Sequence, residues 1–111
     1  MEYKEALKEI AKEYPIDENS KTYSQIDTDI LFDEDNYIFI GVLSRENKTL
    51  LVDYAEYAQL VDYDKYEKQI KELANKYHIS INDYHIEKEY SSYEDIKEFT
   101  KFLLKLRVFL K

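Results

Sequence analysis

The chain of 111 residues contains no cysteine, no tryptophan, one glycine and one proline. Without cysteine there is no disulfide framework and no thiolate zinc site, which favours a reducing compartment. No apolar run approaches the roughly twenty residues that a membrane span needs, so we expect a soluble, cytoplasmic protein without a membrane partner. Because glycine is so scarce, left-handed turn positions must fall to Asn36, Asn47 and the aspartates.

The chain is rich in aspartate and glutamate, and many of these acidic residues lie in one segment. Residues 13–64 carry thirteen acidic and three basic side chains, a local charge of −10 within a total of −8. Apolar residues make up 44% of the chain, too many for a disordered polymer. The length suits one domain, so we expect residues 1–111 to fold as a single acidic domain.

The apolar spacing predicts an α+β fold in the order α-βββ-(α)-α-β-α. Helical spacing covers 3–14, from Asp62 or Asp64 to about His78, and from the capping sequence at Ser92 to Leu110. Runs rich in β-branched and aromatic residues predict a three-stranded antiparallel meander over 30–32, 37–43 and 49–52. Alternation over 84–88 suits a fourth strand, and 55–60 suits a short helical turn. The polar stretch 17–27 lacks periodicity, so we expect a mobile loop there.

The residues that carry catalytic chemistry are few. There are two histidines, no cysteine and no base-coupled serine, so nothing supports a nucleophilic triad. Calcium-loop spacing fails at Asp17 and at Asp33, because the sixth and twelfth positions lack glycine and glutamate. Asp27, Asp29, Asp33 and Asp35 could surround one cation, but solvated carboxylates are the simpler interpretation. We therefore expect no enzyme activity, no cofactor and no metal.

The twelve tyrosines are the second unusual feature. Several lie beside carboxylates, and such a mixture suits an interface with an Arg/Lys-rich surface, where rings stack on guanidinium groups. The alternative is a solvated face that only confers solubility. The predicted partner-binding residues are Asp27, Asp29, Asp33, Glu34, Asp35, Asp53, Tyr54, Glu56, Tyr57, Asp62, Tyr63 and Asp64.

The last predicted helix has the opposite charge. Lys97, Lys101 and Lys105 form one basic stripe at four-residue spacing. Direct nucleic-acid binding is not expected, because the whole chain is strongly acidic. Phe102, Leu106 and residues 108–110 make this helix apolar on more than one side, which suits a homodimer through the C-terminal helix.

Small size, scarce glycine and the clusters Asp27-x-Asp29, Asp33-Glu-Asp35 and Asp53-Tyr-x-Glu56 resemble small phage and mobile-element proteins. The resemblance is to anti-CRISPR and anti-restriction inhibitors that mimic DNA. It implies a non-enzymatic inhibitor whose carboxylates occupy the basic nucleic-acid-binding surface of a defence nuclease. Two alternatives stay open, namely a toxin-neutralising immunity protein and a carboxylate-based metal-dependent enzyme.

Overall fold

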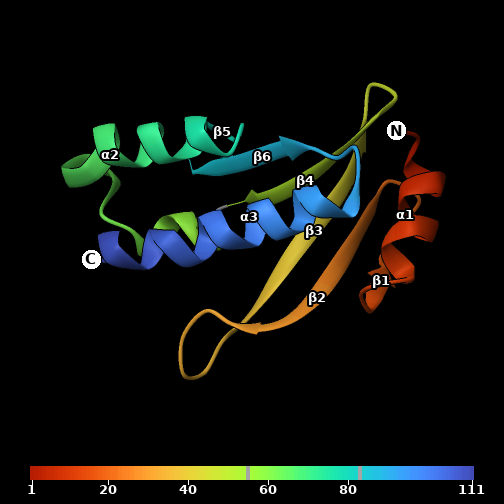
Figure 1. The fold of residues 1–111 in the computed structure, drawn as a ribbon, viewed down its shortest axis with the longest axis horizontal. Coiled ribbons are helices and arrows are strands. Elements are labelled where there is room, and N and C mark those ends of the chain that lie inside the picture. The colour runs from red at the N-terminus through yellow and green to blue at the C-terminus, as the bar shows by residue number, and fades with distance from the viewer. Residues whose placement is uncertain (55, 83) are drawn as a thin grey trace.

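The computed structural model describes residues 1–54, 56–82 and 84–111. Within them lie three α-helices, six strands and two short 3-10 helices (Figure 1). In chain order they are α1 (Tyr3–Ala11), β1 (Ile16–Glu18), β2 (Tyr23–Leu31), β3 (Tyr37–Arg45), β4 (Lys48–Tyr54), η1 (Ala58–Leu60), α2 (Tyr63–Lys76), β5 (Ser80–Asn82), β6 (His85–Glu89), α3 (Tyr93–Lys105) and η2 (Leu106–Phe109).

The strands form one antiparallel sheet in the order β1-β2-β3-β4-β6-β5. The predicted α+β class is therefore confirmed, as is the meander, which consists of β2, β3 and β4. The sheet has two more strands than the sequence predicted. The short helical turn is found as η1, and Ala55, where the expected turn begins, lies outside the described residues.

The mobile loop predicted over 17–27 is wrong, because most of it is strand. Ile16–Glu18 pairs with Ser24–Ile26, and β2 begins at Tyr23. The inward positions of β2 are Ser24, Ile26 and Thr28, all buried. Two of these three are hydroxyl residues, so the period-two pattern of a strand is hidden in a polar composition. The Tyr3 hydroxyl lies 2.5 Å from Ser24 Oγ, which satisfies that buried group.

Local end signals explain where the helices begin and end. Asp62 is the N-cap of α2, since its side chain accepts from the Lys65 N–H at 3.2 Å. At α3, Ser92 and Asp95 form the capping box expected from the sequence. The first helix ends at Ala11, three residues before the predicted end at Tyr14. Pro15 disfavours helical backbone at Tyr14, so the helix could not have continued through that residue.

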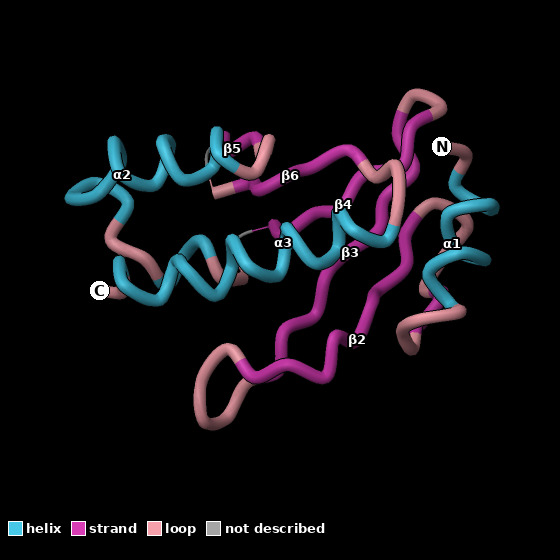
Figure 2. Tube along the Cα trace, in the orientation of Figure 1, coloured by secondary structure: helices cyan, strands magenta, loops and turns pink. Residues whose placement is uncertain are grey.

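The hydrophobic core lies between the sheet and the helices (Figure 2). Ile26, Ile40 and Leu51 point from three neighbouring strands to one face. Against it pack Ala6 and Ile10 of α1 and the buried residues of α3, which are Ile96, Phe99, Thr100, Phe102 and Leu103. Phe102 and Leu106 are thus buried within the molecule and are not free to form the expected homodimer surface.

Left-handed backbone is supplied without glycine. In the described residues, positive φ occurs at Asp29, Glu46, Asn47, His78 and Tyr84. The prediction is confirmed for Asn47 and, among the described aspartates, for Asp29 only. It is wrong for Asn36, and positive φ at Glu46, His78 and Tyr84 was not predicted. Gly41 instead lies in the middle of β3, where a Cβ would be 2.7 Å from the Tyr23 hydroxyl and from Val52 Cγ2. The single glycine therefore serves close packing.

Candidate interaction surface

The end of the β2–β3 hairpin gathers five of the predicted carboxylates. We call residues 27–39 the acidic hairpin; it contains Asp27, Asp29, Asp33, Glu34 and Asp35 and no lysine or arginine. Asp27 pairs with Phe39 and Leu31 with Tyr37, and the register shifts between these pairs. Asp29 occupies the bulge with φ 57°, which a short polar side chain tolerates.

Large apolar side chains are exposed on the same hairpin. Leu31, Tyr37 and Phe39 expose 46%, 47% and 36% of their surface, and Ile30 exposes 39%. The turn itself contacts the body of the protein, because Arg107 of η2 donates to the Phe32 carbonyl oxygen, but these four side chains stay exposed. Leu31 is paired with Tyr37, and Phe39 lies two residues further along β3, so these three side chains share one face of the hairpin. Exposed apolar side chains beside charged ones are a common mark of a protein interface. The sequence analysis placed these four residues in strands but did not assign them to the interaction surface, because the predicted site was chosen from carboxylates and tyrosines beside them.

Asp33 holds the turn of the hairpin in shape. Its Oδ1 accepts hydrogen bonds from the backbone N–H groups of Asp35 and Asn36, both at 2.9 Å. The bond from Asp35, together with the Asn36 amide, lowers the pKa of Asp33 below its ordinary value. Glu34 and Asp35 are exposed. Within the described residues, neither carboxylate accepts a hydrogen bond. Two carboxylates at the tip are therefore available to a partner.

The turn of the hairpin is anchored in the core by Phe32, whose N–H donates to the Asn36 carbonyl at 2.7 Å. Its side chain is buried, and its ring centroid lies 4.9 Å from that of Tyr57. The Arg107 guanidinium donates to the Phe32 carbonyl oxygen at 3.3 Å. Glu56 lines a small cavity together with Phe32 and Asn36. This predicted carboxylate therefore lies next to the acidic hairpin, in addition to the five within it. The turn of the hairpin is thus held in place on the body of the protein.

The prediction that Asp53 and Tyr57 bind a partner has to be corrected, because neither is a surface residue. Asp53 is 4% exposed and Tyr57 is 2% exposed. The Asp53 carboxylate accepts from the backbone N–H of Tyr57, and burial raises its pKa to about 6. The Tyr57 hydroxyl accepts from the Phe39 N–H and donates to the Tyr37 carbonyl. Both side chains stabilise the loop and the hairpin and cannot contact a partner.

Tyr54 is exposed, but its hydroxyl is already engaged. It donates to Glu87, which also receives a two-point hydrogen bond from Arg45 at 2.6 and 3.0 Å. The Arg45 hydrogen bond lowers the pKa of Glu87, while burial and then the Glu87 hydrogen bond raise the pKa of Tyr54 to about 12. This cluster ties β3, β4 and β6 together.

The remaining predicted residues, 62–64, belong to the start of α2. Asp62 caps that helix, while Tyr63 is partly buried, with its ring centroid 6.2 Å from that of Tyr84. Asp64 is exposed in the first turn, where the helix dipole favours an anion. The single tyrosine-rich acidic face expected from the sequence is therefore divided among the acidic hairpin, the interior, β4 and α2.

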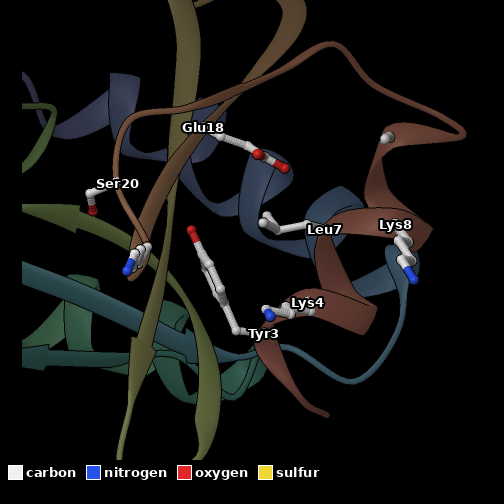
Figure 3. Close-up of a pocket in the computed structure, with 8 residues that line it drawn as sticks. Tyr3, Lys4, Leu7, Lys8, Glu18 and Ser20 are labelled. Carbon is white, nitrogen blue, oxygen red and sulfur yellow. The ribbon is translucent and has the colours of Figure 1, made fainter.

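A separate groove of about 800 Å³ lies between α1 and the segment around β1. Figure 3 shows Tyr3, Lys4 and Leu7 on the helix side and Glu18 and Ser20 opposite them. Its rim carries Lys4, Lys8 and Lys21 together with Glu18, and the Tyr3 hydroxyl is bonded to Ser24. None of the residues that line this groove is an exposed large apolar side chain, so it offers no apolar contact surface to a protein partner.

In the described residues, no three histidine or carboxylate side chains converge to hold a metal ion. Asp27, Asp29, Asp33 and Asp35 therefore do not form one cation site in that part of the chain. Nor is any described helix both long and apolar enough to cross a bilayer. No protein-family model, curated sequence or solved structure matches the chain.

Proposed function

We propose that the chain is a non-enzymatic binding protein whose acidic hairpin occupies a basic protein surface. The observation that carries this proposal is the coincidence of five carboxylates with exposed Leu31, Tyr37 and Phe39 on one anchored hairpin. Carboxylates steer the hairpin toward a cationic partner and set its orientation. The apolar side chains supply the buried contacts from which most affinity comes.

The partner that fits best is the nucleic-acid-binding surface of a nuclease, acting in the cytoplasm. Such a surface is a groove lined with lysine and arginine, and the carboxylates would stand where phosphates bind. The interaction would be an inhibition by competition, as in the anti-CRISPR-like DNA mimics that the sequence resembles. Its affinity should fall as salt screens the charges, over a distance of about 10 Å at roughly 0.1 M.

A double neutralisation of the hairpin tip tests the proposal. Glu34→Gln/Asp35→Asn removes two exposed charges and leaves Asp33, which shapes the turn, unchanged. The matched control, Glu5→Gln/Asp17→Asn, removes two exposed charges from α1 and β1. Immobilised wild type and control should capture nucleic-acid-binding proteins from a bacterial lysate, identified by mass spectrometry, and the tip variant should not.

Competition with DNA distinguishes the mechanisms. The captured nuclease should release a labelled DNA duplex when wild-type protein is added, and the tip variant should need about tenfold more protein. Equal competition by both proteins would refute the DNA-mimic mechanism. Capture of a basic toxin instead would favour the immunity-protein alternative, in which the same hairpin covers a toxin's active site.

A further inference from the structure

An apolar groove lies between α2 and the C-terminal segment. Leu73, Val108 and Phe109 line it, and its volume is about 500 Å³. Val108 exposes 75% of its surface, more than any other large apolar residue among those described. The segment that carries Val108 is nevertheless fixed, because the Asp62 N–H donates to the Phe109 carbonyl at 2.8 Å and the Lys111 N–H to the Leu60 carbonyl at 3.1 Å. The groove is therefore a preformed surface.

Cations from two helices converge beside this groove. The ammonium groups of Lys76 and Lys105, which also line the groove, lie 5.7 and 5.4 Å from the Tyr77 ring centroid. A hydrogen bond with Lys105, reinforced by the charges of Lys105, Lys76 and Lys101, lowers the pKa of the Tyr77 phenol. Lys76 and Lys105 outnumber Glu72, the carboxylate among the residues that line the groove, so an anionic occupant would be favoured.

A molecule that binds in this groove must offer apolar groups to Leu73 and Val108 and negative charge to Lys76 and Lys105. A segment of suitable chemistry is present in the chain itself, namely the acidic hairpin with its exposed Leu31, Tyr37 and Phe39. Contacts of Phe32 with Tyr57 and Arg107 hold the turn of that hairpin on its own molecule, so the occupant has to come from a second molecule. Carboxylates would then meet lysines while apolar side chains meet Leu73 and Val108.

We propose that the groove between α2 and the C-terminal segment binds the acidic hairpin of a second copy of this chain, head to tail. Such a contact is heterologous, because it joins two different surfaces, and repetition produces open chains of molecules. It differs from a symmetric dimer through the C-terminal helix. It does not rest on the proposed function, although a hairpin engaged in this contact would be hidden from any other partner.

Sedimentation velocity on the full chain tests the inference, over concentrations from about 10 µM to about 1 mM. Wild-type protein should sediment increasingly as dimers and longer species, and an increase of salt from about 0.05 M to about 0.5 M should reverse this. Val108→Asp in the groove and Glu34→Gln/Asp35→Asn on the hairpin should each weaken association by about tenfold or more. Glu5→Gln/Asp17→Asn, with the same loss of charge as the hairpin variant, should associate like wild type.

Mixing the two variants provides the decisive measurement. The groove variant keeps an intact hairpin and the hairpin variant keeps an intact groove, so their mixture should form a one-to-one pair that cannot extend. Lys105→Glu serves as a second groove variant, and unchanged circular dichroism confirms folding. The inference is overturned if wild type stays monomeric, if Val108→Asp associates like wild type, or if the mixture forms no pair.

Discussion

The backbone N–H of Tyr57 donates to the buried Asp53 carboxylate at 3.0 Å. A second, longer bond of 3.4 Å comes from the Ala58 N–H to the same oxygen. Asp53 thereby joins the last residues of β4 to the loop that carries Tyr57, and the Tyr57 hydroxyl in turn joins that loop to β3. A side chain in the interior thus helps to position the acidic hairpin.

Asp53 should make stability depend on pH. Burial raises its pKa from an ordinary value of 3.8 to about 6 in the folded chain, so between these values the folded state binds more protons than the unfolded state. The free energy of unfolding should therefore fall as pH rises from about 4 to about 6, by up to roughly 3 kcal/mol from this group. Urea unfolding at several pH values measures it, and Asp53→Asn should flatten the dependence. Equal slopes in both proteins would contradict the assignment.

Tyr57→Phe should loosen the hairpin without removing its charge. The change deletes the hydroxyl that contacts both the Phe39 N–H and the Tyr37 carbonyl, at an expected cost of about 1–2 kcal/mol. Hydrogen exchange at the Phe39 amide should accelerate. Tyr37→Phe is the matched control, since Tyr37 is exposed, and its effect should stay within about 0.5 kcal/mol. Equal protection of the Phe39 amide in both variants would refute the role of Tyr57.

Lys88→Met should destabilise the fold far more than an ordinary surface lysine does. Lys88 is 6% exposed, donates to the Tyr77 carbonyl at 2.6 Å and lies 3.1 Å from Glu98. Removing the ammonium leaves these acceptors without their donor, at a cost of about 1–3 kcal/mol. Lys71→Met, which breaks only the exposed pair with Glu67, should cost about 0.5 kcal/mol or less. Thermal unfolding compares the two, and equal shifts would contradict the expected role of Lys88.

Gly41→Ala should strain the middle of the sheet. The added methyl group would lie 2.7 Å from Val52 Cγ2 and from the Tyr23 hydroxyl, so side chains have to shift. Overpacking of this kind costs about 1–3 kcal/mol. In the Tyr23→Ala background the cost should fall but persist, because the Val52 contact remains. A double-mutant cycle by urea unfolding measures this coupling, and full additivity would show that the ring does not meet the methyl group.

Sequence patterns predicted the parts of the fold that depend on local chemistry. Asp62 and the Ser92–Asp95 pair begin their helices as expected, because a cap needs only residues close in sequence. The first half of β2 was missed because Ser24 and Thr28 satisfy their hydroxyls inside the fold, through Tyr3 and through the Ile38 carbonyl. Those partners are distant in sequence, so a local pattern does not reveal them.

The candidate site was predictable only in part, for a related reason. The acids of the hairpin are exposed because they occupy a turn and a bulge, where side chains usually face water. Asp53 is also an acid with a tyrosine and a second acid close by in sequence, as the exposed candidates are. It is buried because the pairing of β4 with β6 places it opposite the buried Ile86. Exposure is set by strand pairing, which the sequence of one segment does not contain.

The bulge at Asp29 has a consequence for aggregation. β1 pairs with β2 only over residues 24–26, so the outer edge of β2 has no described strand beside it toward Leu31. A flat, apolar strand edge invites pairing with other chains, whereas a bulge and charged side chains prevent it. We therefore expect Asp27 and Asp29 to oppose edge-to-edge pairing of β2 with other chains beside the exposed Ile30 and Leu31.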